Sequence, residues 1–583
     1  MTNPAPTSLD EARRAYETLM DRARGGLGPE AAEAARRAGA IARTFDAERA
    51  IAAYERAIAL DPDHFAAHLG LARLLSATGD NAGAWTAAVR GFRCARAPRE
   101  RAVAAHDLGD LALRAGRLDE AREAFLAFKT VNEELRDAGE DDEEVLRNLA
   151  LGWGRVADVA AMKGDLSEAR QGYEESLAIS VALAQSAPDN GQLQADVGVS
   201  HERLGDLALA LGDLARARVH FEEKRRLMES LIARDSMNAD WARDLGASWA
   251  KLGDLARAEG DVAAARAAYE RGLAVRTQLA VRDAGNIDWA RDLAISWRKL
   301  GDAARAANDF AVARACYFQG VGVVDRLAKR RPEDPDPARE LAGLWARMGE
   351  TAIAENKLES AREAFDQTCA IVTAWAQRDP GSLFWARESA IARDRCGDVA
   401  LRSGAPDVAT AHYADARAIR ARFAAAESSP GPWTRDLAVS DTKMGDVALA
   451  AGDTPRARRH FEASLAVRME LARLSPRDAT LKRELGVCLE RLGMAAHAAG
   501  DARAARSAWE QELRIAEALR AASPTDPKAR RFQAVVHALL ATLAEADQFD
   551  HRQKAIAIFE DLAAERALSP RDTPLLARLR GEV

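Results

Sequence analysis

Several kinds of residue are scarce in this chain, and each scarcity excludes a class of protein. The 583 residues include 19 prolines and five cysteines, and aromatic residues make up 5% of the total. The cysteines are far apart and include no Cys-x-x-Cys pair; they are Cys94, Cys316, Cys369, Cys396 and Cys488. This spacing predicts small buried thiols in a reducing compartment, rather than a disulfide framework or a zinc site.

Long apolar runs and basic blocks are also missing. No stretch reaches the roughly 18 to 20 apolar residues of a membrane helix, and the first ten residues lack the pattern of a secretory signal. We therefore expect a cytoplasmic protein without a membrane partner. The net charge of −7 is interleaved along the sequence, and a run such as Lys224-Arg225-Arg226 has acidic neighbours. Nucleic acid is thus an unexpected partner, and an RNA-binding array is the least favoured hypothesis.

Motifs for catalysis, metal binding or cofactor binding are absent from the sequence. No Gly-x-Ser-x-Gly occurs, and no glycine-rich loop ends in Gly-Lys-Ser/Thr. His64 and His68 are four residues apart, but no glutamate adjoins the first and no third ligand follows. We predict that the chain is not an enzyme and has no catalytic residue, cofactor or metal. A catalytic site assembled from distant residues stays an open alternative.

What the chain has is a repeat of 48 residues. A glycine recurs at this interval, at Gly205, Gly253, Gly301, Gly349, Gly397, Gly445 and Gly493. An aromatic residue does the same, at Phe125, Tyr173, Phe221, Tyr269, Tyr317, Phe365, Tyr413, Phe461 and Trp509. An alanine precedes each aromatic by four residues, from Ala121 to Ala505, and so lies on the same helical face.

Each repeat reads as two helices. Residues 288–307 carry apolar side chains at i, i+4, i+7 and i+8, which predicts an amphipathic helix. Asn308-Asp309 interrupts the pattern, as Gly-Asp does in other copies. Gly or Asn is suited to end one helix, and Asp to cap the next over residues 310–329. One such hairpin cannot bury both of its apolar faces, so the copies are expected to stack as an all-α solenoid.

The repeat resembles the tetratricopeptide repeat (TPR). Trp249, Leu252, Gly253, Ala265 and Tyr269 follow the order of its motif, and the resemblance covers roughly residues 30–560. It implies a right-handed superhelix of antiparallel helix pairs whose first helices line a concave groove. The usual repeat has 34 residues, and the 48-residue form is similar to long-helix repeats of bacterial signalling and conflict proteins.

These patterns divide the chain into four parts. Residues 1–30 are predicted to form an N-terminal capping helix with Leu9 and Leu19 facing inward. Residues 31–96 hold two repeats of about 34 residues, and residues 97–528 hold nine of 48. Residues 529–583 hold a degenerate final repeat and a C-terminal capping helix.

Charged columns supply the candidate groove. Acidic residues follow the repeat glycine, and a basic residue stands three positions before each acid. The resemblance implies that these acids and their variable neighbours contact a partner. The candidate groove residues are Glu202, Asp206, Leu209, Asp254, Arg257, Arg298, Asp302, Arg305, Glu350, Asp394, Asp398 and Asp446. The favoured alternative is an i, i+3 ion pair within each copy, worth about 0.2 to 0.5 kcal/mol.

A tryptophan column opens the first helix in four copies, each followed two residues later by an arginine. The tryptophans are Trp241, Trp289, Trp385 and Trp433, and the arginines are Arg243, Arg291, Arg387 and Arg435. Arginine stacked on indole is one interpretation. A buried contact between adjacent copies is the favoured one.

Two functions remain. The first is a non-catalytic scaffold or sensor that binds a peptide or protein segment in the groove. The alternative is a regulatory subunit for a separate bacterial effector enzyme, such as a caspase-like protease, a kinase or a nucleotide-binding switch protein. The sequence predicts neither the oligomeric state nor the partner's identity.

Overall fold

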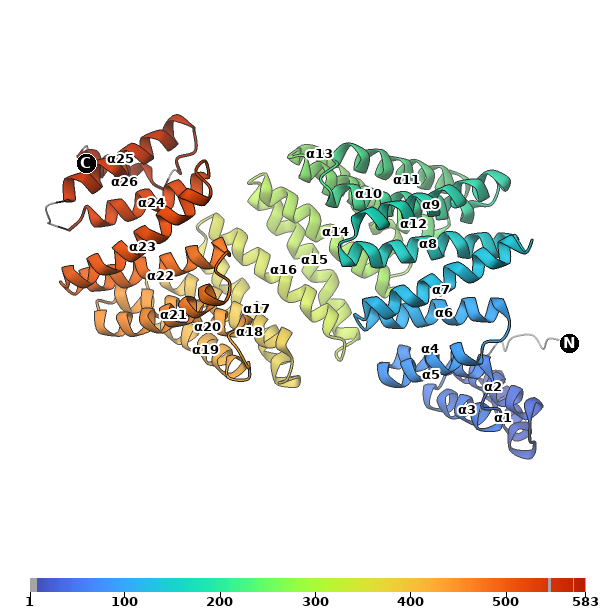
Figure 1. Ribbon diagram of the computed structural model, residues 1–583. Helices are drawn as coiled ribbons and strands as arrows, with labels where there is room; N and C mark the ends of the chain where they lie inside the picture. Colours follow the sequence, from blue (N-terminus) through green and yellow to red (C-terminus); the bar gives the residue numbers. More distant parts are fainter. Residues whose placement is uncertain (1–7, 544–546, 570, 582–583) are drawn as a thin grey trace. The chain divides into compact units, whose positions relative to one another are not determined.

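The computed structural model describes residues 8–543, 547–569 and 571–581, and these residues form 26 α-helices and no strand (Figure 1). The chain divides into two compact units, Met1–Trp289 and Ala290–Val583. In each unit, helices that are consecutive in sequence pack together as antiparallel pairs. The all-α, paired-helix fold predicted from the sequence is confirmed.

The first unit holds a single helix followed by pairs. Its helices are α1 (Leu9–Gly25), α2 (Pro29–Ala42), α3 (Ala47–Leu60), α4 (Phe65–Thr78), α5 (Asn81–Cys94), α6 (Pro98–Arg114), α7 (Leu118–Asp137), α8 (Glu143–Lys163), α9 (Leu166–Ser186), α10 (Gly191–Ala210), α11 (Leu214–Arg234), α12 (Ala239–Ala258) and α13 (Val262–Arg282). The boundary between the units falls within α14 (Ile287–Ala306).

The second unit contains most of α14 and the remaining helices. These are α15 (Phe310–Arg330), α16 (Pro335–Ala354), α17 (Leu358–Arg378), α18 (Leu383–Arg402), α19 (Pro406–Ala424), α20 (Pro432–Ala450), α21 (Thr454–Leu474), α22 (Ala479–Ala498), α23 (Ala502–Ala522), α24 (Pro527–Leu540), α25 (Gln548–Ala564) and α26 (Thr573–Arg580). From α7 to α23, the second helices of successive pairs begin 48 residues apart.

The hinge has the predicted chemistry in six of the nine long pairs, whereas Arg117, Lys357 and Ala405 replace the capping aspartate before α7, α17 and α19. Gly212 and Gly260 adopt φ of +75° and +81°, and Asn308 adopts +59° in the corresponding place. The next residue is an aspartate whose carboxylate accepts a hydrogen bond from the backbone N–H three residues on, as Asp213 does from Arg216 and Asp261 from Ala264. The left-handed residue ends the first helix, and the aspartate caps the second.

The glycine and aromatic columns pack against each other inside each pair. A Cβ added to Gly301 would lie 2.5 Å from Cε1 of Tyr317, and one added to Gly349 would lie 2.6 Å from Cε1 of Phe365. The aromatic rings are fully buried in both cases. Since these distances are far below van der Waals contact, the glycines are required for close packing of the two helices.

The first and last helices each pack apolar side chains on their neighbours. In α1, Tyr16 and Met20 are buried in the first core cluster and Leu19 packs against it, whereas Leu9 is 51% exposed. The inward orientation predicted for Leu9 is therefore wrong, because the apolar stripe of α1 begins one turn later. Leu576 and Leu579 of α26 pack with the core formed by α24 and α25. Residues 1–7 of the predicted N-terminal cap lie outside the described residues.

No helix in the described ranges has the length and apolar character needed to cross a membrane. Within the same ranges, no group of three or more His, Cys, Asp or Glu side chains is arranged to hold a metal ion.

Candidate functional site

The shorter ion pairs of the acidic column join successive repeats. Seven of the acids contact the basic residue 45 positions further along the chain, in the first helix of the next pair. The pairs are Asp110 with Arg155 (3.4 Å), Asp158 with Arg203 (3.3 Å), Asp206 with Lys251 (2.6 Å), Asp302 with Arg347 (3.1 Å), Glu350 with Arg395 (2.7 Å), Asp398 with Lys443 and Asp446 with Arg491 (2.9 Å). We call these pairs the central ladder.

The predicted i, i+3 pairing therefore needs correction. Arg155 and Asp158 do make such a contact, but at 3.7 Å it is longer than the 3.3 Å contact from Arg203 to the same carboxylate. The basic side chain extends toward the first helix of the preceding pair. Its acidic partner therefore belongs to another copy of the repeat. The pairing links one repeat to the next, which the spacing within a single copy does not reveal.

Tyrosines of the aromatic column hold several of the same carboxylates. The hydroxyl of Tyr173 donates to Asp158 at 2.9 Å, that of Tyr317 to Asp302 at 2.7 Å, and that of Tyr413 to Asp398 at 2.6 Å. Tyr269 donates in the same way to Asp254 at 2.7 Å. Burial, together with the aspartate, raises the pKa of each of these tyrosines. These acids thus bridge the second helix of their own pair and, where the ladder pair is formed, the next repeat.

A second ladder lies near the start of the first helices. Arg147 contacts Asp196 at 2.8 Å, Arg387 contacts Asp436 at 3.3 Å, and Arg435 contacts Glu484 at 3.2 Å. The partners are 49 residues apart, so this ladder also joins successive repeats. Arg387 and Arg435 belong to the arginine column noted after the tryptophans, whereas Arg147 and the acids of this ladder were not predicted from the sequence.

Not all predicted groove residues face the ladders. Asp394 is 7% exposed and forms an ion pair with Arg420 at 2.7 Å. Glu202 contacts the buried Lys224 of α11, although it also lies 3.7 Å from the ladder residue Lys251. Both residues stand three positions before a repeat glycine, which directs them toward the second helix of their own pair. This column was predicted to line the groove because it varies between copies. It varies because each residue pairs with a different side chain of the second helix, Lys224 for Glu202 and Arg420 for Asp394.

Four further candidates differ in surroundings. Arg298 contacts Glu340 at 3.1 Å, and Leu209 packs on the core cluster around Phe221. Arg257 and Arg305 are exposed near the end of their helices.

Between the two ladders runs an aliphatic column that was not predicted from the sequence. Its residues stand four positions before the basic residue of the central ladder and so share its face. They are Leu151, Val199, Ala247, Ile295, Ile391, Val439 and Val487, interrupted by Gly343, and all are half-buried or exposed. Val199 and Val487 are each 40% exposed. We call the surface made by both ladders and this column the ladder face.

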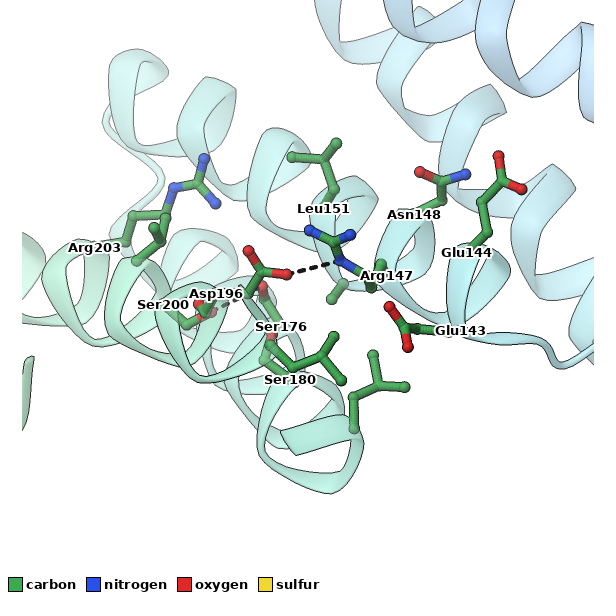
Figure 2. Close-up of a pocket in the computed structure, with 14 residues that line it drawn as sticks. Glu143, Glu144, Arg147, Asn148, Leu151, Ser176, Ser180, Asp196, Ser200 and Arg203 are labelled. Carbon is green, nitrogen blue, oxygen red and sulfur yellow. Dashed lines mark hydrogen bonds and ion pairs between the residues drawn. The ribbon is translucent and has the colours of Figure 1, made fainter. Parts of the chain in front are cut away.

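A pocket of about 510 Å³ opens in the ladder face of the first unit (Figure 2). Its walls come from α8 and α10, which contribute Leu151 and Val199, and its floor comes from the intervening α9. In Figure 2, Arg147 and Asp196 point toward each other across the pocket, joined by an ion pair of the second ladder. The site therefore combines an aliphatic lining with a fixed charged bridge.

Small floor residues leave this pocket open. Ser176 and Ser180 of α9 are 3% and 4% exposed, and Ser176 lies 3.5 Å from Ser200 through their hydroxyl oxygens. At the position of Ser180, later repeats carry longer, buried side chains, including Met228, Arg276, Arg420 and Arg468. Comparing this column across the repeats could have located the pocket from the sequence.

Two acidic residues, Glu143 and Glu144, line the pocket where α8 begins, and further acids precede them in sequence. The loop before α8 and its first turn contain Glu140, Asp141, Asp142, Glu143 and Glu144. Of these, Glu144 is 72% exposed at its side chain. A single arginine, Arg99, makes ion pairs with three of the acids. The rim thus keeps an excess of negative charge, which favours a cationic group next to whatever enters the pocket.

The second unit has a smaller pocket at the same place in the repeat, of about 330 Å³. Arg291, Ile295 and Glu340 line it, and they stand 144 residues, three repeats, after Arg147, Leu151 and Asp196. Val324 replaces Ser180 in the floor, which accounts for part of the lost volume. The cavity thus occurs at the same position of two repeats, and its volume is smaller where the floor residue is larger.

The tryptophan column serves mainly as packing. Trp385 and Trp433 are 2% and 6% exposed and stack on Trp375 and Phe423, with ring centroids 5.4 Å and 4.7 Å apart. The guanidinium of Arg387 also lies 5.0 Å from the ring centroid of Trp433, in the next repeat. At Trp433, the indole is both stacked with an arginine and buried in a contact between adjacent copies. It is therefore not part of an open aromatic cage.

Family comparisons agree with the repeat motif. Residues 43–86 and residues 442–516 each match a family model described as tetratricopeptide repeat. One segment lies in each unit, so the chain contains tetratricopeptide repeats in both. No curated protein matches the chain in sequence.

Several solved structures are similar to the chain. BtubC from P. vanneervenii is 20% identical over 44% of this chain and 90% of its own, with a TM-score of 0.35. The apo form of RapI is 10% identical over 71% of this chain and 97% of its own, with a TM-score of 0.43. Yeast Tom70 is 11% identical over 98% of this chain and 96% of its own, with a TM-score of 0.34.

Proposed function

We propose that this chain is a non-catalytic protein-protein interaction scaffold that binds an extended segment of a partner along the ladder face. Tetratricopeptide repeats generally mediate binding between proteins, which supports this class of function. The ladders fix the first helices relative to their neighbours within a unit. A preformed surface of this kind loses little conformational entropy when a segment binds.

The pocket in the first unit is the main support for this proposal, because its lining residues indicate the kind of side chain that would bind there. A volume of about 510 Å³ lined by Leu151, Val199 and Leu183 accepts an aliphatic side chain. The acidic rim at Glu143 and Glu144 favours lysine or arginine next to that side chain. The proposed ligand is therefore a short segment in which an aliphatic residue is flanked by basic ones.

The finer features of the family assignment belong to this proposal. We infer an array of extended, 48-residue tetratricopeptide repeats of the bacterial type, in a cytoplasmic protein. The regular spacing of the second helices supports the extended repeat. The candidate groove residues that belong to the central ladder, among them Asp206 and Asp302, then serve chiefly to stabilise the surface to which the partner binds.

A peptide-display selection on the purified chain tests the ligand class. We expect enrichment of segments with an aliphatic residue beside lysine or arginine. Replacing Ser180 with Met, the residue that the next repeat carries at this position, fills the pocket without changing its charge. Binding of the selected peptide should weaken at least tenfold, since its aliphatic side chain loses its place.

Ala178→Met provides the matched control, because Ala178 is exposed on the same helix, two residues away. This variant should bind as the unchanged chain does. Equal loss in both variants would mean that the methionine perturbs α9 generally. Selection of acidic peptides, or full binding by Ser180→Met, would contradict the proposed site.

The alternative is a regulatory subunit for a separate effector enzyme. Affinity purification from the native host separates the two functions. A copurifying protease, kinase or nucleotide-binding switch protein whose activity changes on binding would support regulation, and substrate turnover by the isolated chain would contradict both.

A further inference from the structure

Two thiols face each other in the seam between consecutive helix pairs of the second unit. Cys369 lies on α17, the second helix of one pair, and Cys396 lies on α18, the first helix of the next. Their sulfur atoms are 3.3 Å apart, and both are free thiols. A disulfide bond of about 2.05 Å would require the two sulfurs to approach by little more than 1 Å.

The repeat shows that this contact is unusual within the chain. The same two positions carry Leu177 and Leu204 in an earlier repeat, where both belong to one core cluster. The equivalent positions of α13 and α14 carry Leu273 and Leu300. Two cysteines bury less apolar surface than two leucines, so packing alone favours the leucines. The cysteines instead place two sulfurs where these two repeats place methyl groups.

The two thiols differ in access and acidity. Cys396 is 6% exposed, whereas Cys369 is half-buried and so is the one that a small oxidant reaches. A hydrogen bond from Cys396 lowers the pKa of Cys369, against the effect of burial, and the Arg393 guanidinium lowers it further. The same contact and burial raise the pKa of Cys396. Cys369 is therefore the better nucleophile of the pair.

We propose that Cys369 and Cys396 form a reversible thiol-disulfide modification site, with a peroxide as the oxidant. The Cys369 thiolate attacks one oxygen of hydrogen peroxide, the O–O bond breaks, and the hydroxide leaves as water after taking up a proton. Cys369 is then a sulfenic acid. The sulfur of Cys396 attacks it, the S–O bond breaks, a second water leaves with the Cys396 proton, and the S–S bond forms. A dithiol reductant reverses the change.

The bond joins two helix pairs covalently at a point where noncovalent packing otherwise holds them. Arg395, next to Cys396, forms the central ladder with Glu350 at 2.7 Å. Oxidation should therefore restrain the seam between α17 and α18 and the part of the ladder face beside it. This inference does not depend on the proposed peptide ligand.

Counting thiols tests the site directly. The reduced, denatured chain should react with an alkylating reagent at five cysteines. After treatment of the folded chain with hydrogen peroxide, removal of the oxidant and denaturation, three should react. Peptide mapping should find Cys369 linked to Cys396 within one chain. Amide hydrogen exchange in α17 and α18 should slow, and dithiothreitol should restore both measurements.

Cys369→Ser and Cys396→Ser each leave four thiols, and neither variant should form the intramolecular link after peroxide. Cys94→Ser is the matched control, because it removes a cysteine outside the pair. It should still lose two thiols on oxidation. Five reactive thiols after peroxide, linkage between separate chains, or overoxidation of Cys369 without linkage would each overturn the proposal.

Discussion

The helix pairs α10–α11 and α22–α23 share one scaffold and differ in the chemistry between their helices. Gly205 packs against Phe221 in the first pair, and Gly493 packs against Trp509 in the second. An added Cβ would lie 2.6 Å from Cδ1 of the ring in both. Three residues after the aromatic residue, the two pairs carry opposite charges, with Lys224 in α11 and Glu512 in α23.

In α10–α11, the buried Lys224 meets Glu202 and also lies 3.5 Å from Asp244. In α22–α23, the equivalents of Lys224 and Glu202 are Glu512 and Glu490. Glu512 is fully buried, and neither of its oxygens has a hydrogen-bond partner among the described residues. Burial, with Glu490 adding to it, raises the pKa of Glu512 to about 9. The repeat thus keeps the same backbone packing within each pair. The polar contact between the two helices differs, and is an ion pair in α10–α11 and a neutral acid in α22–α23.

Lys224→Glu converts the first contact into the second and should have the largest effect. It replaces a buried ion pair with two facing carboxyls, so the expected loss is about 3 to 5 kcal/mol of unfolding free energy. Urea unfolding followed by circular dichroism measures it. Lys329→Glu, at a side chain 76% exposed, is the control and should change little. Equal effects would mean that net charge, not the buried contact, sets the cost.

Glu512→Gln should act in the opposite direction at neutral and alkaline pH. The folded chain keeps the Glu512 proton up to about pH 9, whereas the unfolded chain releases it near its ordinary pKa. Stability is therefore lost as the pH rises between those two values, by roughly 2 to 4 kcal/mol at pH 7. Glutamine removes this slope.

The measurement for Glu512 is the unfolding midpoint from pH 5 to pH 9 in both proteins. The gain of the glutamine variant over the unchanged chain should grow with pH. A constant difference would show that Glu512 is already ionised in the folded state.

Gly205→Ala and Gly493→Ala should destabilise the two pairs by similar amounts, about 1 to 3 kcal/mol each, since the added methyl group overlaps an aromatic ring. Native-state hydrogen exchange in α11 and α23 reports the local loss. Similar losses would support a common scaffold. A much smaller loss at either glycine would show that its ring can move aside.

Lys251→Met should have the smallest effect. Its ion pair with Asp206 is 30% and 44% exposed at the two side chains, so about 0.2 to 1 kcal/mol is expected. Thermal unfolding at low and high salt measures it, and the difference between variant and unchanged chain should shrink as salt rises. A large, salt-independent loss would mean that the ladder acts through packing.

Much of the fold was predictable from columns of single residues. Gly212 and Asp213 predict a hinge from two adjacent residues alone. Gly301 predicts that another helix packs closely at this position, even before Tyr317 is identified as the contact. The groove was harder to predict. Asp394 and Val199 both vary between copies, but only their neighbours in space reveal that the first is buried against Arg420 and the second lines a pocket.

By itself, the sequence determined the repeat, the paired helices and the residues that hold each pair together, because these depend on spacing along one helix or across one hinge. The tertiary structure decided which acid meets which base, since both ladders join residues from different repeats at separations of 45 and 49. It also decided where a cavity stays open. A pocket depends on the length of a floor residue such as Ser180 relative to walls supplied by two other helices, and no single helix carries that information.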